Sequence, residues 1–580
     1  MFLIFSFLIC FQRGLWVRAL SIASPDSIFR IIKIAEELKI TDIYLQVVIG
    51  GSSYYKSDIL PRSQYLANNA PSDYSPLDSI LKYTKDKGIR VHAWINTFLS
   101  WSLDSIPDST RHIYHKHPEW FIRDISRRSM RDYQSVEWVD LGIEGLYIDP
   151  ANEGVRQYLK EICTELIKKY SISGLHFDFI RYPGTYWGIS DTIVAGLLCG
   201  LGVRDLRWLT LLRYPKLGLF DRWIIYNFYK ENKKRGEAIK KFLEEIKKEI
   251  KGFKKDCIIS CAVFPSPSRA SYQYGQNWWE WKGLIDYPVV MSYTTDINLF
   301  KDFLNFALYN FSEPVMGIGF LWKGMELVAN TEVRIARDAN AGGICYFDFA
   351  SLDTMADLNI LKDRAKVLHE SLLEEKLIVK NDSDKYFSEL PELEWVEKGN
   401  EYIRFGEELD FARFLLQLSF DPDGDINQMG LDRQGFIKMI KSDVAGFEYL
   451  NRILLSNPKE FIEPQYREIE YTFIRWDADS TITRDSAKVI KKLDKKRRVY
   501  PSVLDPLAKV VFETGMNERK TIETKAGIYV FEVKRIKDSK RILKKKDIRP
   551  GLFPIYLYWT IKKGFEQIYS KERCKDEGHK

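Results

Sequence analysis

The chain has 580 residues, of which 45% are hydrophobic and 29% charged, and its net charge at pH 7 is +7. This length exceeds what one hydrophobic core normally organises, so we expect two or three globular domains. The modest positive charge is concentrated in lysine-rich helical segments and near the C-terminus. Together with the lack of a glycine-rich phosphate loop, it argues against the binding of nucleic acids or nucleotides.

The chain begins with a hydrophobic segment, Met1–Gln12 (MFLIFSFLICFQ). This segment is too short to cross a bilayer as a helix. It suits the core of a signal peptide, although the basic residues that normally precede such a core are missing. We therefore expect an exported protein, periplasmic or associated with the cell envelope; a frayed first strand is the alternative. The seven cysteines are scattered, with no disulfide framework or zinc-type spacing, so we expect neither a metal nor a cofactor.

From residue 13 to residue 372, short apolar segments rich in Val, Ile, Tyr and Phe alternate with amphipathic segments, as expected for buried strands and surface helices. We predict strands at Gly14–Ala19, Asp42–Ile49, Arg90–Phe98, Gly174–Ile180, Cys257–Phe264, Tyr287–Tyr293, Val315–Phe320 and Gly343–Phe349. Helices are predicted at Ser27–Leu38, Leu77–Lys87, Asn152–Tyr170, Lys230–Lys251, Ile297–Tyr309, Glu326–Asn340 and Met355–Leu368. This α/β alternation predicts a closed (β/α)8 TIM barrel. An open doubly wound sheet is the alternative, but no dinucleotide loop follows the first strand.

A long connection, Gly184–Phe228, follows the fourth predicted strand and contains Trp187, Trp208 and Trp223. Long connections in compact domains are usually functional, and this one leaves the end of the barrel where catalytic groups lie. We therefore predict a lid or substrate wall in which the three tryptophans line or cap the cleft. An apolar patch that faces a membrane or a partner is the alternative.

The composition changes after residue 372. Residues 373–393 are charged and irregular, which indicates a linker, and residues 394–463 are predicted to be mainly helical. Residues 464–540 have the mixed pattern of a compact α+β unit, and the basic tail, residues 541–580, is predicted to be helical. We thus expect a barrel followed by smaller C-terminal units.

The fourth predicted strand carries the strongest catalytic candidate. Polar residues at the carboxyl ends of barrel strands are typically functional, and the period of two places His176 and Asp178 on one face of this strand. A carboxylate among apolar neighbours loses solvation unless it is paired or functional. We predict that Asp178 is the central catalytic carboxylate. An ion pair with Arg181 or His176 is the structural alternative.

This strand lies in the segment GLHFDFIRYP, which resembles the bacterial glycoside-hydrolase-like family ten. The segments RGLWVRA, DIYLQVVIGGSSYYKSDILP, DSILKYTKDKGIRVHAWINTF, HPEWFIRD and NWWEWKGLIDYPVVMSY agree with the family in order, from about residue 13 to 370. The resemblance implies a TIM barrel related to α-amylase-like hydrolases, and several relatives act on cell-wall glycan or exopolysaccharide. The sequence departs from the family pattern at two places, which bear on the substrate more than on the fold. Phe179 stands where many relatives carry a second acid, and residues 184–228 diverge from the family's shorter pattern.

Glycoside hydrolysis usually requires two carboxyl groups. No carboxylate ends the fifth predicted strand, where an amylase-like acid would stand. We predict Asp348 as the partner of Asp178, with bracing of the barrel as its structural alternative; Asp296, Glu119 and Glu280 are further candidates. Side chains with hydrogen-bonding or aromatic character near the strand ends are predicted to bind the sugar: Gln46, His92, Trp94, Asn96, His176, Arg181, Tyr182, Trp187 and Tyr293.

The C-terminal region has a weaker resemblance to SurA-type chaperones and parvulin prolyl isomerases. Gly430–Leu455 is similar to a chaperone helix, and Tyr471–Arg475 and Glu513–Val530 are similar to the opening and closing strands of a parvulin domain. Thr472 and Tyr529 stand where parvulins typically place histidines. The resemblance therefore implies a degenerate, peptide-binding remnant rather than an isomerase.

These observations together predict hydrolysis of glycosidic bonds in an envelope or extracellular polysaccharide. The substrate would be a polysaccharide or oligosaccharide, and the C-terminal region would contact a peptide or an envelope protein. The aromatic content of 14% suits a carbohydrate-binding cleft, although core packing explains it equally well. The alternative is a non-catalytic carbohydrate-binding or chaperone-like envelope protein that kept the barrel and lost the chemistry.

Overall fold

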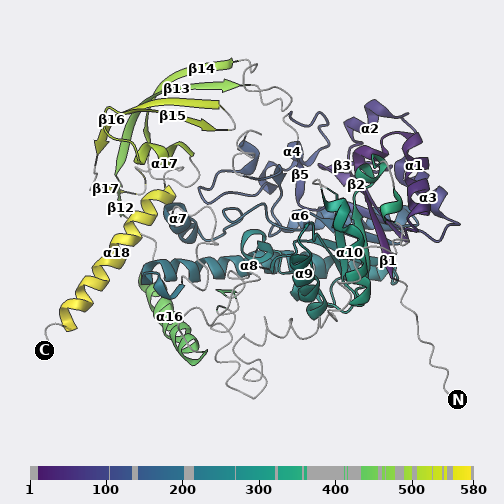
Figure 1. Ribbon diagram of the computed structural model, residues 1–580. Helices are drawn as coiled ribbons and strands as arrows, with labels where there is room; N and C mark the ends of the chain where they lie inside the picture. The colour runs from purple at the N-terminus through teal and green to yellow at the C-terminus, as the bar shows by residue number, and fades with distance from the viewer. Residues whose placement is uncertain are drawn as a thin grey trace.

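The computed structural model (Figure 1) describes residues 11–361 apart from 103–104, 134–141, 202–213, 268, 321–323 and 356–357. Beyond residue 361 it describes residues 411, 414–415, 433–454, 460–463, 465–476, 489–499, 506–524, 527–537, 541–544, 546 and 553–576. Most of the predicted signal segment, the predicted linker, Trp208 and most of the predicted helix Met355–Leu368 lie outside the described residues.

Eight parallel strands close into a barrel. They are β1 (Gln12–Val17), β2 (Asp42–Ile49), β4 (Arg90–Asn96), β7 (Gly174–Asp178), β8 (Ile258–Val263), β9 (Tyr287–Val290), β10 (Val315–Gly319) and β11 (Gly343–Phe347). Neighbours in this series pair in parallel, and β1 pairs with both β2 and β11, which closes the ring. The predicted barrel is confirmed. Most predicted strands extend too far at their C-terminal ends, because residues such as Phe98 and Ile180 stay fully buried after the pairing has ended.

Helices alternate with the barrel strands along the chain. The larger ones are α1 (Pro25–Glu37), α3 (Pro76–Thr84), α6 (Glu153–Lys169), α8 (Leu219–Phe253), α9 (Ile297–Asn310) and α10 (Met325–Asp338). Several of them, among them α1, α3, α9 and α10, lie on the outside of this part of the molecule in Figure 1. Shorter elements are β3 (Ser52–Ser53), α2 (Gln64–Asn69), β5 (Leu99–Trp101), α4 (Ile113–Lys116), β6 (Leu146–Tyr147) and α11 (Phe349–Asp353). Between β8 and β9 the chain forms a π-helical turn, Arg269–Gln273, and a 3-10 turn, Trp278–Trp281.

The interior of the barrel is filled with side chains, so it is a packed core rather than a pore. Large aromatic rings dominate this interior, among them Trp16, Tyr44 and Trp94. His176 lies among them: its Nε2 accepts a hydrogen bond from Trp16 Nε1 at 3.0 Å, and its Nδ1 is 2.9 Å from Ser260 Oγ. Because the Trp16 indole can only donate, Nδ1 must carry the proton of a neutral imidazole and donate to Ser260.

The long connection Gly184–Phe228 is largely helical where it is described. It forms α7 (Thr192–Leu201) and the first turns of α8, which begins at Leu219 rather than at the predicted Lys230. The Trp223 ring is fully buried in a core shared with the C-terminal helices, and its Nε1 donates to Asn451 Oδ1 at 2.7 Å. The prediction that Trp223 lines the cleft is therefore wrong, because the C-terminal helices cover this apolar surface.

The C-terminal elements are α16 (Arg433–Leu454), β12 (Glu460–Ile462), β13 (Tyr466–Trp476), β14 (Val489–Val499), α17 (Pro506–Phe512), β15 (Arg519–Thr524), β16 (Gly527–Lys537), β17 (Ile542–Lys544) and α18 (Phe553–Asp576). Four strands form an antiparallel sheet in the order β14-β13-β16-β15, and α17 contributes to a small core with this sheet. The sheet stands apart from the barrel in Figure 1. An α+β unit thus exists where one was predicted, while its parvulin-like character stays a prediction.

Polar contacts reinforce the packing of α16 against the helical connection. Asp443 accepts hydrogen bonds from Tyr214 Oη at 2.9 Å and from Arg222 Nη1 at 2.8 Å. Glu448 accepts from Tyr226 Oη at 2.7 Å. The connection therefore serves as the docking surface for the C-terminal helices. Within the described ranges, none of the helices has the length and apolar character needed to cross a membrane.

Candidate active site

Asp178 lies at the carboxyl end of β7, beside Asn96 at the end of β4. The next residue, Phe179, has φ of 49°, a left-handed conformation that bulky residues rarely adopt. Its N–H donates to Asp178 Oδ1 at 2.7 Å, and the carbonyl of Asp178 accepts from Thr97 N at 2.8 Å. The chain thus turns sharply at the barrel rim and holds the carboxyl in place. Strained backbone of this kind clusters at functional sites.

The environment of Asp178 favours its protonated form. Burial raises its pKa to about 6, against the opposing effects of the Phe179 N–H, the Arg181 charge and the Trp94 indole N–H. The Trp94 N–H faces the carboxyl without completing a hydrogen bond of ordinary geometry. The negative charge of Glu144 raises the pKa of Asp178 further. Since Asp178 is still partly accessible, it can exchange a proton with a ligand at the rim.

Arg181 fills an aromatic pocket next to Asp178. Its guanidinium lies 4.7–5.8 Å from the ring centres of Tyr147, Phe179, Phe264 and Tyr274. Only 5% of the residue is exposed. Its Nη2 donates to Glu144 at 2.9 Å, while the buried Nη1 has no hydrogen-bond partner among the described residues. Arg181 is therefore fixed in place with one N–H group still unpaired.

Glu144 belongs to this site, although the sequence did not indicate it. It lies just before β6, which pairs with β5 on the connection that follows β4. Its Oε1 accepts from Arg181 and its Oε2 accepts from Tyr147 Oη at 3.1 Å. Burial raises its pKa, but the charge and hydrogen bond of Arg181 outweigh this effect and hold the pKa below its usual value. Any carboxylate on this connection was a candidate from topology alone, since the connection leaves the catalytic end of the barrel.

Asp348, the predicted partner of Asp178, is fully buried and engaged in structural contacts. Its Oδ1 accepts from the N–H and the hydroxyl of Ser351 at 3.2 and 2.8 Å, which caps α11. Its Oδ2 pairs with Arg18 from the end of β1. Both carboxylate oxygens are thus bonded to neighbouring side chains, and these bonds link the ends of β1 and β11. These contacts favour the bracing role for Asp348.

The other carboxylate candidates also have structural or peripheral places. Asp296 caps α9 through the N–H of Asn298 at 2.9 Å. Glu119 is exposed and pairs with His117 at 3.1 Å. Glu280 lies in the 3-10 turn between β8 and β9 and accepts a hydrogen bond from Asn277 Nδ2 at 3.4 Å. Within the described ranges, His, Cys, Asp and Glu side chains form no group of three that could hold a metal ion.

Three predicted sugar-binding residues do lie at the rim. Gln46 accepts from the N–H of Ala19 at 3.0 Å and donates to Asn96 Oδ1 at 2.9 Å, which links the ends of β1, β2 and β4. The partly buried ring of Tyr293 contacts β10. Its phenol pKa is raised by burial and by nearby groups that include Asp178 and Asp348. Because it stays protonated, Tyr293 can donate a hydrogen bond to a ligand between these carboxylates.

Other predicted sugar-binding residues are packing residues. His92 lies four residues before Asn96, or roughly 13 Å along β4, and pairs with Asp42 at 2.7 Å near the opposite end of the barrel. His176 uses both ring nitrogens inside the barrel, as described above. Tyr182 is buried 4.6 Å from the Arg235 guanidinium, and Trp187 packs 5.3 Å from the Tyr133 ring. Strand periodicity placed His176 on the correct face of its strand, but it did not indicate how deep in the barrel either histidine lies.

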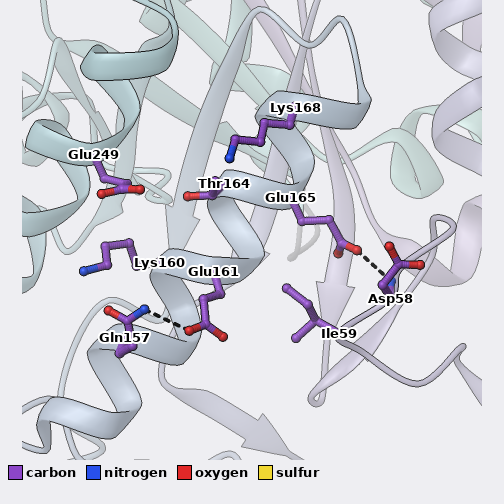
Figure 2. A pocket seen from close by; sticks show the side chains of 9 residues that line it. All are labelled: Asp58, Ile59, Gln157, Lys160, Glu161, Thr164, Glu165, Lys168 and Glu249. Carbon is purple, nitrogen blue, oxygen red and sulfur yellow. Dashed lines mark hydrogen bonds between the residues drawn. The ribbon is translucent and has the colours of Figure 1, made fainter.

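A separate hollow of about 340 Å³ lies on the outer wall of the barrel (Figure 2). Its lining comes from α6, from Glu249 on α8 and from the loop after β3, and it carries charges of both signs. Asp58 donates its backbone N–H to Glu165 Oε1 at 2.6 Å, and Gln157 bonds Glu161 at 2.8 Å. Since catalytic groups of such barrels lie at the strand ends, this hollow on the helical flank has no part in the candidate active site.

Comparisons with known proteins match the N-terminal half of the barrel. A family model described as "Glycosyl hydrolase-like 10" matches residues 12–196, the segment that contains Asp178, Glu144 and Arg181. The "Glycosyl hydrolase DigH" of Escherichia coli K12 is 24% identical over 206 residues, which cover 31% of this chain and 45% of that protein. The "Glycosyl hydrolase YngK" of Bacillus subtilis is 23% identical over 154 residues, 26% of each chain. The chain thus spans less than half the length of these curated relatives.

Among solved structures, the PgaB (BpsB) glycoside hydrolase domain from Bordetella bronchiseptica aligns with a TM-score of 0.43 and 14% identity, covering 61% of this chain and 98% of that chain. The family model confirms the similarity to glycoside-hydrolase-like proteins for residues 12–196. The parvulin-like resemblance of the C-terminal region stays a prediction.

Proposed function

We propose that the protein hydrolyses glycosidic bonds in an envelope or extracellular polysaccharide, with Asp178 as its central catalytic carboxylate. The observation that carries this proposal is the Asp178 carboxyl at the end of β7, partly accessible and with a pKa raised to about 6 by burial. Support also comes from the family model, which covers this residue, and from curated relatives that are named glycosyl hydrolases.

In this proposal Asp178 acts as the proton donor. Its Oδ1 is held by the Phe179 N–H, so Oδ2 would carry the proton. As the bond from the anomeric carbon to the leaving oxygen breaks, its electron pair stays on that oxygen and the Asp178 proton passes to it. Gln46, Asn96 and Tyr293 would orient the sugar hydroxyls at the rim.

The direct test is the variant Asp178→Asn, assayed for the release of reducing ends from cell-wall glycan and exopolysaccharide. We expect the rate to fall by at least about a hundredfold, as for the loss of other general acids. Asp86→Asn, which changes an exposed aspartate in the turn after α3, is the control for removing a charge. Turnover by Asp178→Asn at the wild-type rate would contradict the proposal.

The second candidate is a carbohydrate-binding protein without catalysis. The engaged carboxylate of Asp348 favours it, since the partner predicted from the sequence is held by Arg18 and Ser351. Calorimetry with the same glycans distinguishes the two candidates. Binding by the wild-type protein without any release of reducing ends would support the second one.

Two parts of the proposal concern the remaining chain. The hydrophobic segment Met1–Gln12 supports export to the periplasm or cell envelope, which N-terminal sequencing of the mature protein can test.

The resemblance around Thr472 and Tyr529 supports contact of the C-terminal region with a peptide or an envelope protein, without prolyl isomerase turnover. A proline-peptide isomerisation assay on the full chain checks the second part.

A further inference from the structure

Glu144 and Asp178 share the same neighbours. Arg181 donates to Glu144 at 2.9 Å, and its charge also acts on Asp178. Tyr147 donates to Glu144 at 3.1 Å, and the charges of both carboxyls act on the Tyr147 hydroxyl. The hydrogen bonds to Glu144 and the electrostatic effects on Asp178 place both carboxyls near one guanidinium and one phenol at the catalytic end of the barrel.

The Glu144 carboxylate also has room for a ligand. Its side chain is 44% exposed, in contrast to the fully buried side chain of Asp348. Each of its oxygens takes one hydrogen bond from the described side chains, whereas a carboxylate can accept about four. Glu144 is thus held in a fixed direction while part of its surface stays open.

The environment of Arg181 holds its guanidinium rigidly beside Glu144. Its Nη1 is buried and unpaired among the described residues, although the rest of the side chain is clamped between aromatic rings. A buried unpaired donor costs stability, and such groups occur where a structure is strained, hydrated or functional. The rigid guanidinium thus fixes the direction of the Glu144 carboxylate, whose exposed part stays open to a ligand.

We propose that Glu144 is the second catalytic carboxylate, the ionised partner of Asp178 in glycosidic bond cleavage. This inference rests on the proposed hydrolase function and adds the residue that the predicted Asp348 does not supply. The electrostatics agree with it, because the site raises the pKa of Asp178 and lowers that of Glu144. When the surroundings of two carboxyls move their pKa values apart in this way, the group with the raised pKa acts as the acid and the other as the base or nucleophile.

Two reaction courses are compatible with these roles of Glu144 and Asp178. Glu144 can accept a proton from water while the water oxygen bonds to the anomeric carbon and Asp178 protonates the leaving oxygen; Glu144 then ends protonated and Asp178 ionised. Alternatively, a Glu144 oxygen bonds to the anomeric carbon while the bond to the leaving oxygen breaks and Asp178 protonates that oxygen; water then displaces Glu144 as it loses a proton to the ionised Asp178. The stereochemistry of the first product, observed by NMR, separates these forms.

The experiment compares Glu144→Gln and Glu144→Ala with the wild type on the full chain. The probes are a panel of 2,4-dinitrophenyl glycosides of glucose, galactose and N-acetylglucosamine, together with the glycan used for Asp178→Asn. Glu245→Ala is the matched control, because Glu245 pairs with another buried arginine, Arg156, at 3.2 Å on the barrel flank. Near-ultraviolet circular dichroism verifies that each variant is folded.

We expect both Glu144 variants to lose at least about a hundredfold in rate on every substrate that the wild type cleaves, and Glu245→Ala to lose little. Azide should restore the cleavage of dinitrophenyl glycosides by Glu144→Ala and yield a glycosyl azide, because this anion attacks carbon without a base. A structural partner of Arg181 would not give that product. Asp178→Asn should retain more activity on these glycosides than on glycan, since their leaving groups need little protonation.

Each contrary result has a distinct meaning. Wild-type rates for Glu144→Gln, alongside an inactive Asp178→Asn, overturn the role of Glu144 and leave the hydrolase proposal intact. Loss of rate in Glu144→Ala without azide rescue also overturns it, because the residue then acts only through Arg181. If the wild type cleaves no glycoside and no glycan, the proposed function fails, and the role of Glu144 fails with it.

Discussion

Replacing Asp178 by asparagine should stabilise the folded protein while it abolishes the proposed activity. Burial raises the pKa of this carboxyl from 3.8 to about 6, so its ionised form is disfavoured in the folded state. A rise of this size corresponds to an unfavourable free energy of up to roughly 3 kcal/mol near neutral pH. The amide oxygen of asparagine can accept the same Phe179 N–H without carrying a charge. The variant thus removes the free-energy cost of burying a charged carboxylate and keeps the hydrogen bond from the Phe179 N–H.

The gain in stability should depend on pH in one direction. Below pH 3.8 the carboxyl is protonated in both the folded and the unfolded chain, so it contributes no penalty. Between pH 3.8 and about 6 the unfolded chain releases the proton and the folded chain keeps it, so wild-type stability falls as pH rises. Above that range both states are ionised and the full cost persists. Asp178→Asn should therefore gain most at neutral pH and little near pH 4.

The assay is urea unfolding, followed by tryptophan fluorescence at about pH 4 and about pH 7.5. The difference in midpoint between Asp178→Asn and wild type is compared at the two pH values, with Asp86→Asn as the control for charge removal. An equal gain at both values would refute the reasoning. So would a variant that is less stable than wild type at pH 7.5, because the desolvation of Asp178 would then not be a cost to folding.

Further predictions concern the pH profile, the rim and the docking surface. The wild-type kcat/KM on glycan should fall about tenfold per pH unit above the Asp178 pKa of about 6, as measured by initial rates. Gly319→Ala would place a Cβ 2.8 Å from Tyr293 Cδ1, so the ring must move; we expect a loss of roughly tenfold or more in kcat/KM with an unchanged circular dichroism spectrum. Trp223→Ala should cost about 3–5 kcal/mol of stability and expose the C-terminal helices to limited proteolysis, because its buried ring and its bond to Asn451 are lost. Wild-type digestion of the last variant would show that the docking does not depend on this ring.

The barrel was predictable because its signals are local. Apolar strands and amphipathic helices follow from neighbouring residues, and the position of Asp178 at a strand end follows from the strand itself. The depth of a residue within the barrel is a different matter, since it depends on where each strand begins relative to its neighbours. His92 and Asn96 belong to the same strand, yet the first pairs with Asp42 at one end and the second reaches the rim at the other.

The sequence by itself therefore determined the fold class, the order of the strands and the carboxylate at the end of β7, because short-range patterns encode them. Only the tertiary structure decided how distant side chains share their bonds. Arg18, which follows the first barrel strand, pairs with Asp348, which follows the last one. Arg181 pairs with Glu144, which lies on a connection whose sequence predicted no strand. The part of the connection around Trp223 became a docking surface, since burying its apolar area against the C-terminal helices removes that area from water.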